Sequence, residues 1–169
     1  MSRKPTLLCV DDDVQCLQVR KIMLEAFGFK VTTTSDPRQA LRIHSMQSFD
    51  AAVLDFQMPH LNGAELAKSM KMARPDVPVV ILSGLPDLPE DAPQYHDRFF
   101  CKAESGIKVA QEILSLIETH SGHGGRRVPA TKRMMAAAGI LFGFATQGLT
   151  EIRHRIFHGP LIARGMPAA

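Results

Sequence analysis

The sequence predicts an α/β fold with a doubly wound, five-stranded parallel sheet. Short apolar runs of strand length alternate with segments that carry helical spacing or helix-capping signals, and this alternation is typical of parallel sheets with right-handed crossovers. The run at residues 51–54 is apolar throughout, as in strands that helices cover on both faces. The 169 residues, 45% of them hydrophobic, suffice for one good core. We therefore expect one domain with an appendage.

Start and stop signals mark the elements along the chain. Gly28 closes the first helix, and Asp36 followed by Pro37 gives an N-cap and a proline in the first helical position. Asn62 and Gly63 form a strong turn dipeptide before the third helix. The expected strands are 6–10, 30–34, 51–55, 77–82 and 98–101, and the expected helices are 14–27, 37–46, 64–73 and 105–118.

The segment between the last two strands is poor in helix signals. Pro86, Pro89 and Pro93 lie close enough together to interrupt a regular helix at every turn. We expect a loop with at most one helical turn over residues 85–97. The fourth helix of a five-helix arrangement is thus predicted to be shortened or absent.

Polar side chains follow the ends of four predicted strands. Asp11 and Asp12 follow the first, Asp55 closes the third, Ser83 follows the fourth and Lys102 follows the fifth. Ligands of open α/β sheets bind beyond this carboxyl edge. Three clustered carboxylates repel one another unless a cation lies between them, and Mg²⁺ prefers such oxygen ligands. An Asp run before a helix can instead serve only as a cap, which is how we interpret Asp13.

A site of this composition favours an incoming phosphoryl group. The metal and Lys102 would offset its charge, the Ser83 hydroxyl could donate to one of its oxygens, and Gly84 would leave room and supply a backbone N–H. Asp55 could then attack phosphorus. The predicted chemistry is formation of an aspartyl phosphate.

Four motifs resemble those of response-regulator receiver domains of two-component signalling, CheY-like proteins. They are VDD at 10–12, LDFQMPHLNG at 54–63, LSG at 82–84 and the lysine at 102. The resemblance covers about residues 5–120 and implies a flavodoxin-like fold with strand order 2-1-3-4-5. It also implies Asp55 as phosphoacceptor, Asp12 and Asp55 as direct Mg²⁺ ligands, Asp11 as a ligand through water, and the backbone carbonyl of Gln57 as a further ligand.

The same resemblance assigns the switch residues. It implies Ser83 as the hydroxyl that moves toward the phosphoryl group, Lys102 as the charge partner of that group, and Phe99 in the position of the mobile aromatic. Two features depart from the family pattern. Ala103 follows Lys102 where the family usually has proline, and Phe99 lacks a phenolic hydroxyl.

The functional hypothesis is a stand-alone receiver that a histidine kinase or histidine phosphotransfer protein phosphorylates. It would signal to an unknown downstream protein within a phosphorelay, and it would catalyse only its own modification and dephosphorylation, not turnover of another substrate. One alternative is a Mg²⁺-dependent hydrolase with Asp55 as nucleophile, but this needs a general acid two residues on, and Gln57 cannot serve. The other is a phosphorylation-independent interaction module, which would have no need of clustered carboxylates.

Charge divides the chain into a receiver and a basic tail. Residues 1–120 hold 13 Lys/Arg and 16 Asp/Glu, whereas residues 121–169 hold 7 and 1. We expect a receiver at 1–120, a linker at 121–133 and an apolar, basic tail at 134–169, helical or disordered. The tail's apolar run is short for a bilayer span, so a loose or docked tail is favoured over membrane contact, and no motif predicts sequence-specific nucleic-acid binding. The three cysteines lack a disulfide spacing and indicate the reducing cytoplasm.

Overall fold

The computed structural model describes residues 3–121, in which strands and helices alternate except that the fifth strand follows the fourth with no helix between them. The predicted bounds agree with the observed ones to within three residues at every end. The elements are β1 (Thr6–Val10), α1 (Val14–Ala26), β2 (Lys30–Thr34), α2 (Pro37–Met46), β3 (Ala51–Asp55), α3 (Gly63–Ala73), β4 (Val79–Ser83), β5 (Arg98–Cys101) and α4 (Gly106–Ser121).

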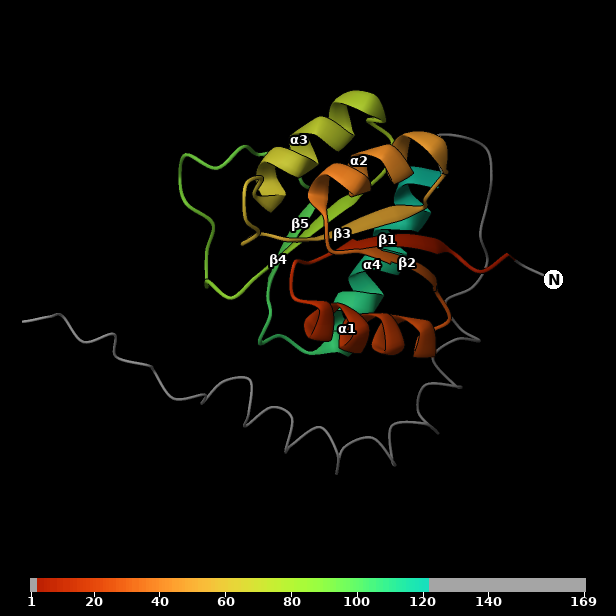
Figure 1. Ribbon diagram of the computed structural model, residues 1–169. Coiled ribbons are helices and arrows are strands. Elements are labelled where there is room, and N and C mark those ends of the chain that lie inside the picture. Colours follow the sequence, from red (N-terminus) through yellow and green to blue (C-terminus); the bar gives the residue numbers. More distant parts are fainter. Residues whose placement is uncertain (1–2, 122–169) are drawn as a thin grey trace, which may run out of the picture.

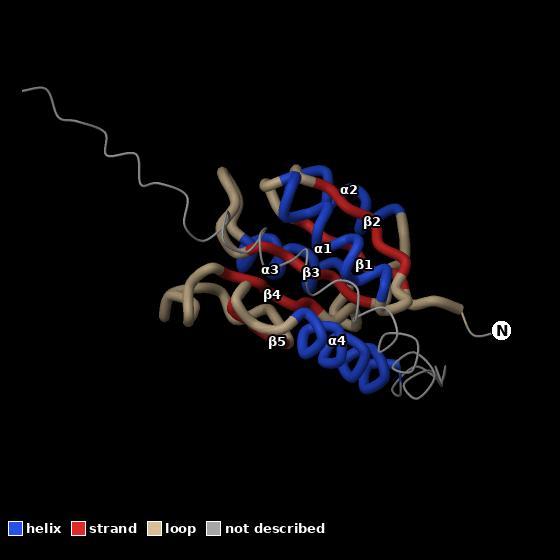
Figure 2. Tube along the Cα trace, turned by 90° about the horizontal axis from the view of Figure 1, so that it is seen from below, coloured by secondary structure: helices blue, strands red, loops and turns tan. Residues whose placement is uncertain are grey.

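The five strands pair in parallel in the order β2-β1-β3-β4-β5. This confirms the expected fold class. Helices α2 and α3 cover one face of the sheet and α1 and α4 cover the other (Figure 1). The view from below shows β2 and β5 at opposite edges of the sheet (Figure 2). Because all strands run in one direction, their carboxyl ends meet along a single edge.

Side-chain alternation along the strands divides the core into two layers. In β1, Leu7 and Cys9 belong to the layer shared with α1 and α4, whereas Leu8 and Val10 belong to the layer shared with α2 and α3. All four are fully buried, as expected of a strand covered on both faces. Burial raises the pKa of the Cys9 thiol to about 12, so this cysteine is an inert part of the core.

Side chains cap the starts of the first three helices, at Asp13 and Asp36 as predicted and at Asn62, where the sequence predicted only a turn. The Asp13 carboxylate accepts hydrogen bonds from the backbone N–H groups of residues 15 and 16, which confirms Asp13 as a cap. Asp36 caps α2 ahead of Pro37. Asn62 and Glu65 form a reciprocal capping box at α3. The last of these caps fixes the start of α3 directly after the Asp55 loop.

The segment between β4 and β5 contains turns and bends but no helix over residues 84–97. The helix that we predicted to be shortened or absent is therefore absent from this segment. Leu88 and Ala92 still pack against the layer under α2 and α3. Lys68 of α3 lies 5.8 Å from the centre of the Tyr95 ring, a cation–π contact that ties the loop to the helix. An irregular but packed connection therefore joins β4 to β5.

The predicted linker and tail lie outside the described residues, apart from residue 121, which ends α4. Their assignment to residues 121–133 and 134–169 stays a prediction. None of the helices within residues 3–121 has the length and apolar character needed to cross a membrane.

The buried His44 makes the stability of the fold depend on pH. This residue of α2 is 1% exposed. Burial, with a smaller contribution from the Arg74 charge, lowers the pKa of His44 below 6.5. The unfolded chain therefore binds this proton more readily, and the free energy of unfolding should fall as pH drops below about 6.5.

Replacing His44 should flatten this dependence. We expect His44→Leu to lose less stability than the parent between pH 7.5 and pH 5.5, as measured by urea midpoints. Some slope should remain because burial also lowers the pKa of His96. The exposed His60, whose φ of 69° suits asparagine, offers the control His60→Asn. An unchanged slope in His44→Leu would contradict the account.

Candidate functional site

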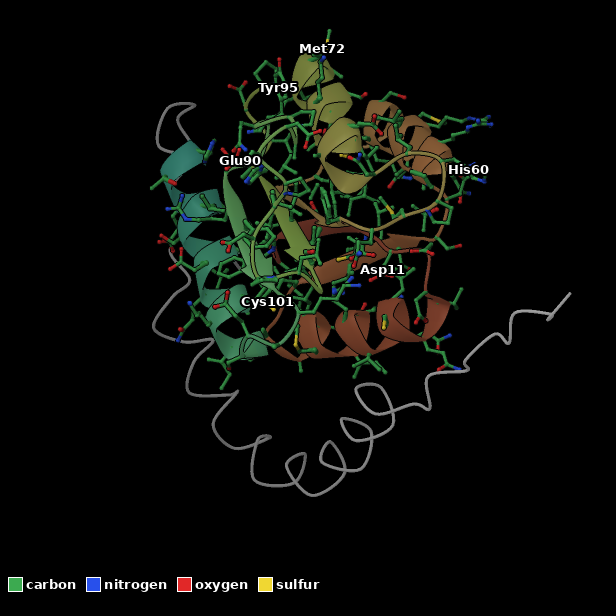
Figure 3. The ribbon with its side chains drawn as sticks, turned by 90° about the vertical axis from the view of Figure 1, so that its left-hand side faces the viewer. Asp11, His60, Met72, Glu90, Tyr95 and Cys101 are labelled. Carbon is green, nitrogen blue, oxygen red and sulfur yellow. The ribbon has the colours of Figure 1, made fainter. Side chains whose placement is uncertain are left out.

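Three carboxylates meet at the carboxyl edge of the sheet. Val10 of β1 is paired with Leu54 of β3, so the residues that follow, Asp11 and Asp55, lie side by side. One carboxylate oxygen from each of Asp11, Asp12 and Asp55 lies within 4.8 Å of the others. Asp11 and Asp55 are buried and Asp12 is exposed. Figure 3 labels Asp11 directly above α1. The cluster is therefore enclosed by protein at Asp11 and Asp55 and open to solvent at Asp12.

Lys102 reaches into this cluster from the loop after β5. Its Nζ lies 2.7 Å from Oδ1 of Asp55 and 3.3 Å from Oδ2 of Asp11. The contact with Asp55 is a close ion pair, and the Lys102 ammonium also donates a hydrogen bond to Asp11. The Lys102 backbone N–H donates to the Ser83 carbonyl at 2.6 Å. The backbone therefore holds this lysine at the mouth of the site.

Burial and charge oppose each other at the ion pair. Burial raises the pKa of Asp55; the Lys102 ammonium lowers it, and the neighbouring Asp11 raises it again, for a net increase. Burial works against the charge on Lys102, but Asp55 and Asp11 outweigh it and raise the pKa of Lys102. The lysine is therefore charged at neutral pH, as a partner for anions must be.

The predicted hydroxyl and glycine lie on the β4 side of this edge. Asp55 pairs with Leu82 in the sheet, which places the buried Ser83 one residue beyond it. Within the described residues, the Ser83 hydroxyl accepts the Leu85 N–H at 3.0 Å and makes no hydrogen bond to Asp55. A Cβ at Gly84 would lie 3.5 Å from the side-chain oxygen of Gln57. Gln57 and Gly84 are therefore neighbours across the mouth.

Phe99 belongs to the hydrophobic core and not to the acidic cluster. It is half-buried on β5, paired with Ile81, and packs against the layer beneath α2 and α3. Its predicted switch role would thus operate through packing. Ala103, the departure after Lys102, is joined to it by a trans peptide bond.

Two residues of the site were missed by sequence reasoning. Arg20 of α1 is buried, and its NH1 lies 2.8 Å from Oδ2 of Asp11. Gly63 begins α3 so close to the strand end that a Cβ there would lie 2.2 Å from the carbonyl oxygen of Asp55. The sequence offered a weak signal only for Gly63, a glycine at a helix start; apolar residues on more than one face of α1 hid the inward position of Arg20.

The donor set fits a hard divalent cation. Carboxylate oxygens are the preferred ligands of Mg²⁺, which usually binds one or two of them and retains water. Oxygens of Asp12 and Asp55 lie within 4.8 Å of one another, and the exposed Asp12 leaves the cluster accessible to that water. The acidic cluster therefore supports Mg²⁺ binding.

Fold and site together define a class of doubly wound α/β proteins with an acidic, lysine-containing site at the carboxyl edge of the sheet. The sequence model of the response regulator receiver domain family matches residues 7–96, more than half of the chain. The chain belongs to this family, whose members act in two-component signalling.

Similar proteins agree with this assignment. Protein RcaC of Microchaete diplosiphon is 33% identical over an alignment of 118 positions, and the match covers 66% of this chain and 18% of RcaC. A receiver domain protein from Clostridium thermocellum has a TM-score of 0.63 and 26% identity, covering 69% of this chain and 97% of that one. TrrA of Thermotoga maritima, solved in complex with Mg²⁺-BeF, has a TM-score of 0.63 and 21% identity, covering 66% and 98%. The chain thus spans a whole receiver domain but about a fifth of RcaC.

Proposed function

We propose that Asp55 accepts a phosphoryl group from a phosphohistidine of a sensor kinase or a histidine phosphotransfer protein. The observation that carries this proposal is the buried Asp55 carboxylate with the Lys102 ammonium 2.7 Å away and two further carboxylates beside it. An Asp55 oxygen forms a bond to phosphorus while the phosphorus–nitrogen bond to the donor histidine breaks. The imidazole leaves with the bonding electron pair and takes up a proton.

The metal-binding roles follow the arrangement of the oxygens. Asp12 and Asp55 would bind Mg²⁺ directly, together with the backbone carbonyl of Gln57. Asp11, which already accepts hydrogen bonds from Arg20, Lys102 and the Asp13 N–H, would bind it through water. Bound Mg²⁺ would offset negative charge on the phosphoryl oxygens. TrrA, a neighbour in fold, was solved with Mg²⁺ and a beryllium fluoride group, which is consistent with these roles.

Lys102, Gly84 and Ser83 would hold the transferred group. Lys102 would pair with a phosphoryl oxygen, and the N–H of Gly84 would donate to another. Ser83 would have to release the Leu85 N–H, its present partner, and turn toward the phosphoryl group. Phe99 would then repack against the layer beneath α2 and α3. These two movements would link phosphorylation of Asp55 to a change in the surface formed by residues 83–104.

The output would be a protein–protein interaction of the receiver. Residues 1–120 form the receiver in this proposal, 121–133 a linker and 134–169 a basic tail. The loop over 84–97 replaces a helix, so the partner would contact a surface that differs from a helical one. Transfer onward to a second histidine would make the chain an intermediate of a phosphorelay.

Leu85 should make the phosphoryl form long-lived. Its side chain is 38% exposed beside the mouth of the site, where it would hinder an attacking water. We expect Leu85→Glu, which can orient that water, to lose the phosphoryl group about tenfold faster than the parent. Leu85→Met is the matched control and should decay at the parental rate. Equal lifetimes of the Glu variant and the parent, followed by intact mass after donor removal, would count against this role.

Intact mass tests the proposed function. The full chain, incubated with Mg²⁺ and a small phosphodonor such as acetyl phosphate, should gain one phosphoryl adduct. The adduct should be absent from Asp55→Asn and from a chelator-treated sample. A chain that takes up no phosphoryl group from acetyl phosphate or from a phosphohistidine donor would act instead as a phosphorylation-independent module.

A further inference from the structure

Arg20 occupies a buried position that an apolar side chain would ordinarily fill. Its neighbours along the buried stripe of α1 are Leu17 and Leu24, and the Arg20 side chain is 9% exposed. A buried arginine is costly unless a carboxylate neutralises it. Here the partner is Asp11, one of the three clustered carboxylates.

The contacts of Asp11 show that Arg20 is part of the site's charge balance. Oδ2 of Asp11 lies 2.8 Å from Arg20 NH1 and 3.3 Å from Lys102 Nζ. Oδ1 accepts the backbone N–H of Asp13 at 3.0 Å. Both oxygens are therefore occupied by donors from the protein. Asp11 is held in place and its charge is offset before any metal arrives.

We propose that Arg20 is a positioning residue that weakens Mg²⁺ binding to the unmodified site and makes tight Mg²⁺ binding depend on the phosphoryl group. This inference rests on the proposed phosphorylation of Asp55. It adds a role for a side chain outside the motifs at 10–12, 54–63, 82–84 and 102. The reason lies in the number of charges that share the site.

Three carboxylates and two cations, Arg20 and Lys102, leave the unmodified site with one net negative charge. One Mg²⁺ overcompensates this charge. Phosphorylation replaces the single charge of Asp55 with about two, so the site with Arg20 becomes neutral only when metal and phosphoryl group are both present. With an apolar residue at position 20, the site would be neutral with Mg²⁺ alone. With Arg20 present, the site is therefore electrically neutral when it holds both Mg²⁺ and the phosphoryl group, and not when it holds Mg²⁺ alone.

Calorimetric titration of the full chain with Mg²⁺ tests this role. Arg20→Met should bind Mg²⁺ roughly tenfold or more tightly than the parent, because a buried unit charge close to a divalent ion is weakly screened. Beryllium fluoride, which adds one negative charge at Asp55 as the phosphoryl group does, should raise the Mg²⁺ affinity of the parent to about that of Arg20→Met without beryllium fluoride, because the two sites then carry the same net charge.

Two further variants separate charge from packing. Arg20→Gln keeps an N–H donor for Asp11 without the charge and should also bind Mg²⁺ more tightly, which keeps the test available if Arg20→Met does not fold. Lys21→Met removes a charge from the next residue of α1, where the side chain is 42% exposed and pairs with Glu25. Its Mg²⁺ affinity should stay within about twofold of the parent because exposed charges are screened.

The outcomes distinguish this inference from the proposed function. Equal Mg²⁺ affinities of the parent, Arg20→Met and Arg20→Gln would overturn the role of Arg20 and leave phosphorylation of Asp55 intact. Tighter binding in Lys21→Met of the same size as in Arg20→Met would also overturn it, since the effect would then be one of net charge. Failure of the parent and of both Arg20 variants to bind Mg²⁺ would overturn the metal site itself.

Discussion

Lys102→Met is expected to slow phosphoryl transfer to Asp55 by about a hundredfold or more, because it removes a preorganised cation from the place where phosphoryl charge develops. The ammonium lies 2.7 Å from Asp55, and burial limits its screening by solvent. Methionine keeps most of the length of the side chain, so the loss reports the charge. The rate of adduct formation with acetyl phosphate, followed by intact mass, measures the effect.

Lys108→Met is the matched control for this variant. Lys108 lies six residues on, in α4, where it is exposed and pairs with Glu104. The Lys108→Met substitution makes the same change in net charge at a distance from the acidic cluster. The phosphorylation rate of this variant should therefore stay within about twofold of the parent. A Lys102→Met rate equal to the parental rate would show that the ion pair is only structural.

Gly63→Ala is expected to destabilise the fold by about 2–3 kcal/mol and to slow phosphorylation at least tenfold. The added Cβ would lie 2.2 Å from the carbonyl oxygen and 2.9 Å from the carbonyl carbon of Asp55. Both are backbone atoms that no rotamer change can move. Either α3 or the end of β3 must shift, and a shift of β3 moves the acceptor carboxylate. Urea unfolding and the rate of adduct formation measure the two losses.

Gly84→Ala is the control for stability. Its Cβ would lie 3.5 Å from the flexible Gln57 side chain, which is ordinary contact, so the loss of stability should stay under about 1 kcal/mol. Neither Gly63 nor Gly84 has a positive φ. The two positions therefore differ in the space available for a Cβ and not in backbone strain. Equal unfolding midpoints for Gly63→Ala and Gly84→Ala would contradict this account.

The fold could be predicted because its signals are local. Each strand of a parallel sheet is buried on both faces, so each one reads as an apolar run, and the caps at Asp13, Asp36 and Asn62 are readable as side chains ahead of helices. The prolines of 86–93 exclude a regular helix without reference to the rest of the chain. Residues that follow the strands meet at one edge because all strands run in parallel, and this alone brings Asp11, Asp55 and Lys102 together.

Arg20 could not be placed from the pattern of α1. That helix carries apolar residues on more than one face: Val19 and Ile22 are 41% and 69% exposed, while Arg20 is buried. Spacing therefore did not identify the inward face. The role of Gly63 depends on how closely α3 approaches β3, which is a tertiary contact. The hydrogen bond from Leu85 to Ser83 is likewise a property of the folded loop and not of residue type.

Chemical mapping of the modified residue tests the central claim that Asp55 is the phosphoacceptor. Borohydride reduces an acyl phosphate to an alcohol, so treatment of the phosphorylated chain followed by peptide sequencing in a mass spectrometer should find homoserine at position 55 and aspartate at positions 11 and 12. Homoserine at position 11 or 12, or a phosphoryl adduct that borohydride leaves untouched, would contradict the account.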